Sequence, residues 1–265
     1  MDASGLHVEH HGDGPRALVL AHGFGGSARN WRPQIRAFRE RFRVVTYDAR
    51  GHARSAAGGA PAAYSLASAV ADFDAVVAGC GDPRPIVGGL SMGAAVALAW
   101  ATERPSNPVA LVLSAFPAGP ESGRGVSAHA LVFAAAIDRE GLEAAGERYA
   151  WGRSSGLDAQ GRALVRQGFL EHDPAALAHT LRGVLAELPS PKTWADRLVA
   201  VDAPVLAIAG DRDAAAVEAN RVLARANPRV EMATVPDAGH VVNLAQPAAF
   251  NARLEAFFGA VVGEG

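Results

Sequence analysis

Short apolar runs recur along this chain, and they constrain its fold more than any other feature. Five of them lead into turns, and they cover residues 17–23, 42–51, 85–91, 109–115 and 203–211. Because an uninterrupted apolar strand is buried on both faces, such runs are typical of parallel sheets. Segments with helical apolar spacing separate the first runs, at residues 30–41, 65–79 and 93–105. Strands that alternate with helices predict a three-layer α/β fold.

The alternation of strands and helices stops between residues 117 and 191. Helical patterns follow one another there, and no buried strand is evident. The alternation then resumes, with strands expected at 205–209 and 230–235 and helices at about 215–226 and 247–258. We therefore expect an α/β core with a helical insertion, the core at residues 1–116 and 195–265 and the insertion, a cap, at residues 117–194.

The composition excludes several classes of function. Of the 265 residues, 49% are hydrophobic and 20% are charged, and the formal net charge is −2. No strong field therefore favours nucleic acid or an anionic membrane as a partner. The single cysteine, Cys80, cannot form an internal disulfide, and the first residues lack the pattern of a signal peptide. The apolar runs are too short to span a membrane. We expect a cytoplasmic protein that acts on a small molecule.

The pattern Gly-x-Ser-x-Gly at residues 89–93 is the first candidate for chemistry. Ser91 lies where the third apolar run meets the helical segment that follows it. On such a tight turn the hydroxyl projects away from the sheet, and small residues are needed two positions away on either side, where the chain has Gly89 and Gly93. The next helix points its free backbone N–H groups at the same place. This context predicts a nucleophile rather than a plain turn.

A serine hydroxyl is a weak nucleophile and needs a base, for which His240 is the candidate. It follows the last predicted strand, which places it at the carboxyl edge of the sheet, on the same side as Ser91. His22, beside the first strand turn, is better suited to shaping its loop. The other histidines that we weighed lie near the N-terminus or in the insertion: His7, His10, His11, His129, His172 and His179. No cluster of carboxylates or cysteines accompanies the N-terminal group, so we expect no metal site.

The base in turn needs a carboxylate that holds its tautomer and stabilises the imidazolium. The segment GDRD offers Asp211 and Asp213, just past the end of a predicted strand. Asp213 is far enough from the strand to turn back toward His240, whereas Asp211 is better suited to a structural role in the loop. The expected chain order is therefore serine, aspartate, histidine.

An acyl-transfer site also needs hydrogen-bond donors for the oxyanion. The backbone N–H of Met92, next to Ser91, is one expected donor. The other is expected from the glycine-rich turn HGFGG, with Phe24 as the first choice and Gly25 as the second. The glycines of this turn allow the backbone to approach a substrate closely.

These segments together resemble the α/β-hydrolase superfamily. The landmarks AHGFGGSARNW, YDARGHARS, GLSMG, GDRD and AGH occur in the order and spacing typical of that superfamily, over about residues 1–116 and 195–265. The resemblance implies an eight-stranded, mostly parallel sheet flanked by helices, with a helical cap inserted before the acid. Ala53 stands where the second landmark usually has glycine, in a loop where we expect little effect on function.

The cap and the C-terminal half resemble one branch of that superfamily. It holds 3-oxoadipate enol-lactonases, meta-cleavage-product hydrolases and the menaquinone-pathway synthase that eliminates pyruvate. Ser91 separates the chain from epoxide hydrolases and haloalkane dehalogenases, which carry aspartate at that position. The synthase usually has arginine where this chain has Ala95, and the meta-cleavage hydrolases tend to have asparagine where it has Leu90. Both departures argue against those activities.

The substrate-binding residues that we expect are Gly25, Leu90, Trp151, Arg182 and Val241. Two of them have a second interpretation. Arg182, in the insertion, would meet a substrate carboxylate or else form a solvated salt bridge. Trp151 would line an apolar pocket or else pack the cap against the core.

The leading hypothesis is a serine hydrolase that cleaves a carboxylic ester or lactone of a small, largely apolar substrate through an acyl-enzyme. It requires no metal or organic cofactor. One alternative is C–C bond hydrolysis or pyruvate elimination by the same three residues. Another is a signalling protein that binds a small molecule and acts through its cap on a protein partner. We expect a monomer or a homodimer.

Overall fold

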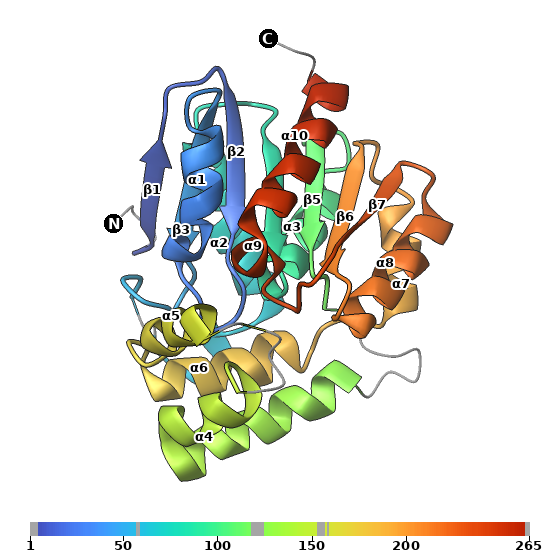
Figure 1. The fold of residues 1–265 in the computed structure, drawn as a ribbon. Coiled ribbons are helices and arrows are strands. Elements are labelled where there is room, and N and C mark those ends of the chain that lie inside the picture. The colour runs from blue at the N-terminus through green and yellow to red at the C-terminus, as the bar shows by residue number, and fades with distance from the viewer. Residues whose placement is uncertain (1–4, 57–58, 118–124, 153–156, 158, 263–265) are drawn as a thin grey trace.

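The computed structural model describes residues 5–56, 59–117, 125–152, 157 and 159–262. One sheet forms the centre of the molecule, with helices on both faces and a layer of helices across one end (Figure 1). Its strands, in chain order, are β1 (His7–His11), β2 (Arg16–Ala21), β3 (Phe42–Asp48), β4 (Ile86–Leu90), β5 (Ala110–Ser114), β6 (Val205–Gly210) and β7 (Val230–Val235).

The strand order in the sheet is β1-β3-β2-β4-β5-β6-β7. Every neighbouring pair is parallel except β1 with β3. The predicted apolar runs are confirmed as strands β2 to β6, and all residues of β4, β5 and β6 are buried. The α/β-hydrolase fold is therefore confirmed, but the described residues form seven strands and not the expected eight. β1 and β7 are the two edge strands, and only Gly5 and Leu6 precede β1 within the described part.

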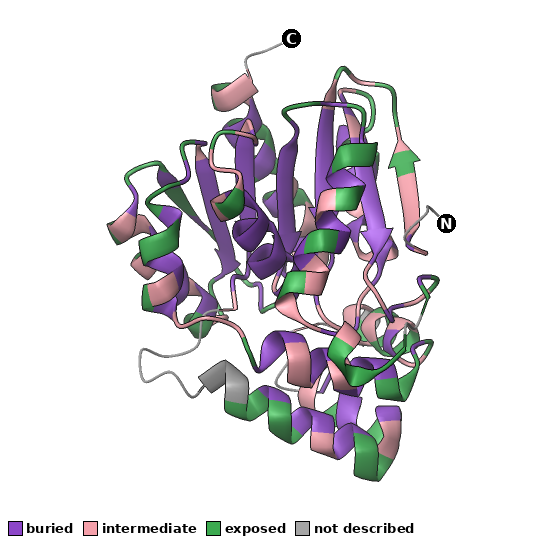
Figure 2. Cartoon of the chain, turned by 180° about the vertical axis from the view of Figure 1, so that it is seen from behind, coloured by how far each residue is buried: buried purple, intermediate pink, exposed green. Residues whose placement is uncertain are grey.

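Two sets of helices cover the two faces of the sheet. One face carries α2 (Leu66–Gly79), α3 (Met92–Glu103), α7 (Pro191–Leu198) and α8 (Ala214–Ala226); the other carries the 3-10 helix η1 (Ala28–Trp31), α1 (Arg32–Phe38), α9 (Val242–Ala245) and α10 (Pro247–Val262). Figure 2 shows central strands that are buried along their length, an edge strand near the N-terminus that is not, and helices with exposed outer faces. α3 differs, because it is buried from Met92 to Ala101, where small alanine side chains let it lie close to the strands. Ser65 caps α2, accepting the Ser68 N–H at 3.1 Å.

The predicted helical insertion lies between β5 and β6. It comprises α4 (Gly125–Tyr149), α5 (Ala159–Phe169), α6 (Pro174–Thr180) and the π-helical turn η4 (Leu181–Leu185). We call these elements the cap, and Figure 1 shows α4, α5 and α6 across the carboxyl ends of the strands. Gly141 interrupts α4 with a φ of 78°, which a glycine adopts without strain. Buried apolar side chains of the cap form a cluster that also includes Met92 of the core.

Helix α7 crosses the expected boundary of the insertion at residues 194 and 195. Trp194 and Leu198 are fully buried in the apolar cluster of the core, and the Trp194 ring meets Phe116 at a centroid distance of 5.8 Å. Since these contacts are with the core, we propose that the cap ends before α7.

The edge strand β1 was not predicted as part of the sheet. Its sequence is HVEHH, and none of its residues is buried. Glu9 lies between the Nε2 atoms of His7 and His11, each 3.2 Å from one of its carboxylate oxygens. It also forms an ion pair with Arg54. Arg54 lies in the connection between β3 and α2, which includes the 3-10 helix η2 (Pro61–Ala63). β1 therefore presents polar, partly paired side chains at the edge of the sheet.

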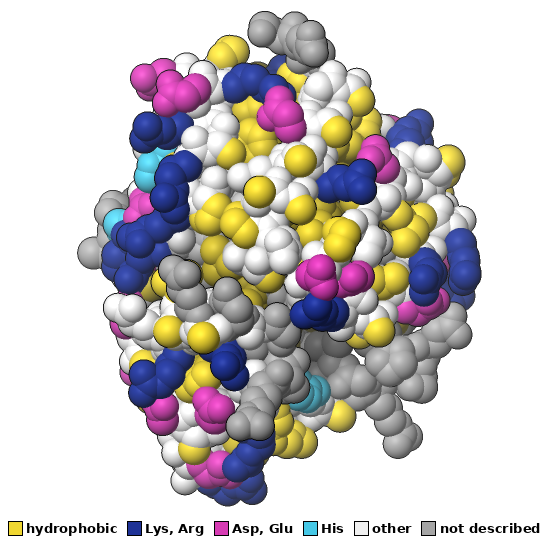
Figure 3. All heavy atoms as spheres, in the orientation of Figure 1, with side chains coloured by type: hydrophobic (Ala, Val, Ile, Leu, Met, Phe, Trp, Pro, Cys, Tyr) yellow, Lys and Arg dark blue, Asp and Glu magenta, His cyan; other side chains and the backbone are white. Residues whose placement is uncertain are grey.

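The surface carries charges of both signs. Acidic and basic side chains are interspersed on the face shown in Figure 3, and many form ion pairs, as Arg41 does with Glu255. None of the helices in the described part has the length and apolar character needed to cross a lipid bilayer.

Candidate active site

Ser91 occupies the turn between β4 and α3. Its backbone has φ 52° and ψ −114°, a conformation that few residues other than glycine adopt. Its N–H donates to the carbonyl of Ser114 in β5 at 2.8 Å, which fixes the turn against the neighbouring strand. Such strain persists only where the surroundings enforce it, and it clusters at functional sites. The turn holds the side chain of Ser91 at the carboxyl edge of the sheet.

The two glycines that flank Ser91 have the tight contacts that the sequence predicts. A Cβ added at Gly89 would lie 2.3 Å from the carbonyl carbon of Gly93. One added at Gly93 would lie 2.2 Å from the carbonyl oxygen of Ala21. Both neighbours are backbone atoms and cannot rotate away. The turn therefore requires glycine at both positions.

Substitution of Gly93 by alanine is expected to destabilise the fold by about 3 kcal/mol, because the added methyl group overlaps the backbone of β2. Gly79, at the end of α2, is the matched control, because an added Cβ there meets nothing within 4 Å. Gly79→Ala is expected to stabilise the protein by about 0.5 kcal/mol through the entropy of the unfolded chain. Urea unfolding measures both, and equal midpoints for the two variants would refute the explanation.

The side chains of Ser91, His240 and Asp213 form a continuous hydrogen-bonded series. His240, in the turn between β7 and α9, places Nε2 2.9 Å from the Ser91 hydroxyl and Nδ1 2.6 Å from a carboxylate oxygen of Asp213. Asp213 begins α8, and its other carboxylate oxygen accepts the Ala216 N–H at 3.2 Å. Because three separate loops follow parallel strands, they meet at one edge of the sheet. The structure thus brings the three predicted catalytic side chains together.

The environment of Asp213 keeps its carboxylate charged. Burial raises the pKa of this group, but the hydrogen bond and the charge of His240, with the Ala216 N–H, outweigh burial and lower the pKa below its ordinary value. Asp211 has a different environment, since its carboxylate accepts the Ala238 N–H at 3.3 Å. The structural role predicted for Asp211 in its loop is confirmed.

The loop between β2 and η1, residues 23–26, lies beside Ser91, and we call it the oxyanion loop. A Cβ added at Gly23 would be 3.5 Å from the Cβ of Ser91, which shows how close the two segments approach. The N–H of Phe24 has no acceptor among the described residues, and the N–H of Met92, the first residue of α3, has none within its helix. Both predicted oxyanion donors are therefore available at this edge of the sheet.

His22 holds the start of the oxyanion loop. Its Nδ1 lies 2.7 Å from the carbonyl of Gly23, and its Nε2 accepts the Ala49 N–H at 2.9 Å. A carbonyl can only accept, so Nδ1 carries the proton and the ring is neutral. Burial lowers the pKa of His22 to about 4, although the Gly23 carbonyl and the charge of Asp48 raise it. The loop-shaping role predicted for His22 is confirmed.

The low pKa of His22 makes the fold sensitive to acid. The unfolded chain takes up this proton near pH 6.5 and the folded chain only near pH 4. Stability is therefore complete above pH 6.5 and falls as the pH decreases toward 4, by about 1.4 kcal/mol per pH unit for this one group. Urea unfolding at pH 7, 6 and 5 measures the slope, and His22→Gln, which cannot titrate, is expected to reduce it. An unchanged slope in that variant would contradict the assignment.

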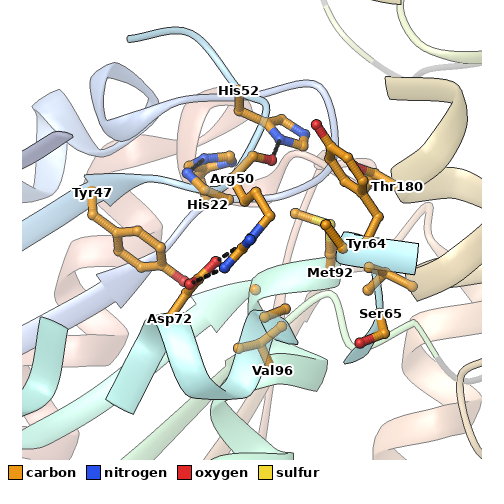
Figure 4. A pocket seen from close by; sticks show the side chains of 15 residues that line it. His22, Tyr47, Arg50, His52, Tyr64, Ser65, Asp72, Met92, Val96 and Thr180 are labelled. Atoms are coloured by element: carbon orange, nitrogen blue, oxygen red, sulfur yellow. Dashed lines mark hydrogen bonds and ion pairs between the residues drawn. The ribbon is translucent and has the colours of Figure 1, made fainter. Parts of the chain in front are cut away.

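A cavity beside Met92 contains residues that the sequence analysis did not select (Figure 4). Arg50, after β3, forms an ion pair with Asp72 of α2 at 2.7 Å. The fully buried His52 donates from Nδ1 to the Arg50 carbonyl at 3.0 Å. The YDARGH landmark could have indicated Arg50 and His52, because it begins in a buried strand and continues past the sheet edge at which Ser91 lies.

Three of the expected substrate-binding residues lie beside Ser91, beside His240 or in the oxyanion loop. Leu90 precedes Ser91 and is 5% exposed, and Val241 follows His240 and is half-buried. Gly25 has a φ of 67° and faces the Phe169 ring of the cap, where an added Cβ would lie 2.4 Å from a ring carbon. Gly25 therefore marks a close approach of the cap to the oxyanion loop.

The other two expected substrate-binding residues have structural partners within the cap. Trp151 is 2% exposed and packs edge-on against Phe169 at a centroid distance of 5.4 Å. Arg182 forms an ion pair with Asp138 of α4, and both side chains are exposed. The salt-bridge interpretation of Arg182 describes its contact, whereas the ring contact of Trp151 lies within the cap and does not join the cap to the core.

Comparison with known proteins gives the family. The sequence profile of the alpha/beta hydrolase family matches residues 18–253. The chain belongs to the alpha/beta hydrolase family. Within the described part of this α/β hydrolase, no group of three or more His, Cys, Asp or Glu side chains is placed to hold a metal ion.

Individual relatives of this α/β hydrolase carry several names. RutD of Klebsiella pneumoniae, which bears the name carbamate hydrolase, is 28% identical over 90% of this chain and 89% of its own length. A Bacillus subtilis protein that bears the name 2-succinyl-6-hydroxy-2,4-cyclohexadiene-1-carboxylate synthase is 28% identical, with the same coverage. The structure of a thermophilic esterase from Thermogutta terrifontis aligns with a TM-score of 0.83 at 26% identity, over 97% of this chain and 93% of that one. The synthase belongs to the branch that the sequence resembles, so the resemblance is confirmed.

Proposed function

We propose that this α/β hydrolase is a serine hydrolase that cleaves a carboxylic ester or lactone of a small, largely apolar substrate. The observation that carries the proposal is the series of hydrogen bonds from Asp213 through His240 to Ser91, at 2.6 and 2.9 Å. The similarity to the Thermogutta terrifontis esterase supports the ester as the bond that is cleaved.

The geometry assigns a direction to each proton. The Asp213 carboxylate only accepts hydrogen bonds, so the proton of neutral His240 lies on Nδ1, and Nε2 is left to accept the Ser91 proton. As Ser91 Oγ attacks the carbonyl carbon, its proton moves to His240 Nε2, and Asp213 stabilises the imidazolium. His240 then protonates the leaving alkoxide, which leaves an ester of Ser91. A water molecule that gives its proton to His240 hydrolyses this acyl-enzyme and restores the Ser91 hydroxyl.

The negative charge of the tetrahedral intermediate needs donors that are already in place. The N–H groups of Phe24 and Met92 are those donors in our proposal, since they flank Ser91 from two loops. Donors of this kind act more strongly on the transition state than on the substrate, which raises kcat rather than lowering KM.

The surroundings of Phe24 support an apolar substrate. The Phe24 ring contacts Phe133 and Phe169 of the cap at centroid distances of 5.6 and 6.0 Å. A substrate between the cap and Ser91 would lie against these rings, which favour an apolar acyl group.

A carbamate is a second candidate substrate, because RutD of Klebsiella pneumoniae bears the name carbamate hydrolase and matches 90% of this chain. Its carbonyl accepts the same attack by serine. Pyruvate elimination has less support. Ala95, which stands where the synthase usually has arginine, is uncharged and fully buried. Arg182 is already paired with Asp138, so neither side chain offers a free cation to a substrate carboxylate.

Purified protein assayed on p-nitrophenyl acetate, butyrate and octanoate tests the proposal. We expect rapid release of p-nitrophenol, with a preference among chain lengths that measures the acyl pocket. A p-nitrophenyl carbamate in the same assay tests the second candidate. Turnover of a coloured ring-fission product in the absence of ester hydrolysis would contradict the proposal and favour C–C bond cleavage. Tight ligand binding without turnover would favour a signalling role.

The remaining expectations belong to the same proposal. We infer a cytoplasmic enzyme that acts as a monomer or homodimer on a small-molecule substrate, with a reaction in which no step uses a metal or an organic cofactor.

A further inference from the structure

The corner between α5 and α6, residues 169–173, contacts the oxyanion loop at successive positions. The Phe169 ring lies against Gly25 and meets the Phe24 ring. Glu171 forms an ion pair with Arg29 of η1, the helix that follows the loop. The cap therefore meets the loop through both apolar and charged contacts at this corner.

His172 adds a polar contact at the centre of the corner. The side chain is buried, with 6% of the residue exposed, and its Nε2 lies 3.0 Å from the carbonyl oxygen of Gly26. Its Nδ1 lies 3.1 Å from the carbonyl oxygen of Phe169. A carbonyl only accepts, so each contact requires a proton on the corresponding nitrogen.

The two carbonyl groups differ in their need for His172. The Phe169 carbonyl also accepts the backbone N–H of His172, at 3.3 Å. The Gly26 carbonyl has no other donor among the described residues. Since a buried carbonyl without a donor is costly, the proton on Nε2 is the one that the loop requires.

The other polar contacts of the oxyanion loop come from the core. The Gly23 carbonyl accepts from His22 and from the Gly26 N–H, at 2.7 and 3.0 Å. The next N–H, that of Ser27, donates to the Asn30 side chain at 2.7 Å. These bonds fix the loop at its start and just beyond its end. The Gly26 carbonyl, between them, is held from the cap.

We propose that His172 is a positioning residue, whose Nε2–H holds the Gly26 carbonyl and thereby keeps the Phe24 N–H directed at the oxyanion beside Ser91. This inference rests on the proposed function and names a part of the cap that the acyl-transfer step requires. The oxyanion exists only in the transition state and the tetrahedral intermediate. Loss of the contact should therefore lower kcat and leave KM nearly unchanged.

Two conservative substitutions separate the two nitrogens of His172. The amide nitrogen of His172→Gln is expected to reach the position of Nε2 and to keep the bond to Gly26. That of His172→Asn is expected to reach the position of Nδ1 and to keep only the bond to Phe169. With p-nitrophenyl butyrate, we expect kcat of the asparagine variant to fall about tenfold. This loss is larger than that expected from one weakened hydrogen bond and smaller than that expected from complete loss of an oxyanion donor. The glutamine variant should stay within about twofold of the parent.

A second measurement tests the contact without turnover. Hydrogen exchange of peptides that cover residues 22–30 should be faster in His172→Asn than in the parent and unchanged in His172→Gln. Equal kcat and equal exchange in parent and asparagine variant would overturn the inference. Parallel loss of kcat in both variants would also overturn it, because that result indicates a purely structural histidine. If the parent cleaves no ester, the proposed function fails, and the exchange rates still decide whether His172 holds the loop.

Discussion

Substitution of Ser91 by alanine is expected to lower kcat for p-nitrophenyl butyrate by about 10⁵-fold. Residues of a catalytic triad act as a unit, so loss of the attacking oxygen removes nearly all of their joint effect. The residual rate should come from binding and from the oxyanion donors, which the substitution leaves in place.

The stability of this variant provides the control. Alanine has the same difficulty as serine in adopting a φ of 52° at this turn, and the backbone bond from residue 91 to Ser114 is retained. The thermal midpoint should therefore stay close to that of the parent. A variant that keeps a tenth or more of the parental rate would show that Ser91 is not the nucleophile.

Substitution of Asp213 by asparagine should lower kcat by about 10⁴-fold. Asparagine offers an amide to His240 and no longer fixes the proton on Nδ1 or stabilises the imidazolium. It still accepts the Ala216 N–H, so the N-terminal cap of α8 should survive. The lowered pKa of Asp213 keeps the parent carboxylate ionised near neutral pH, and the difference between the two proteins should persist throughout that range.

Asp211→Asn is the matched control for that experiment. Asp211 lies two residues away in the same loop, and its contact with the Ala238 N–H needs only an acceptor oxygen, which asparagine retains. We expect kcat within about twofold of the parent, because no hydrogen bond is lost. If Asp211→Asn had the larger effect, the acid of the series would have to be reassigned.

The parts of the fold that could be predicted share a physical cause. A strand with helices on both sides must be apolar on both faces, and this requirement leaves a readable run in the sequence, as in β4 and β6. β1 has no such requirement, since none of its residues is buried. Its polar sequence therefore does not differ from that of a loop, and it was missed.

The same reasoning explains what could be predicted of the site. Ser91, Asp213 and His240 each follow a parallel strand, so their position in the chain is enough to place them at one sheet edge. The contacts of the cap have no comparable rule. The spacing of apolar residues shows which face of a helix is buried but not what it meets. The contact of His172 with Gly26, across 146 residues, and that of Arg182 with Asp138 became visible only in the folded chain.

The polar edge strand has a consequence for the behaviour of the protein at high concentration. A strand at the border of an open sheet exposes unpaired backbone groups onto which another chain can add a strand. In β1 the Glu9 carboxylate already binds two histidines and Arg54 beside those groups. An incoming strand would have to pair beside this cluster of charged and polar side chains, and charges along an edge strand disfavour such pairing. We expect that the side chains that made β1 hard to predict also disfavour addition of a further strand at this border of the sheet.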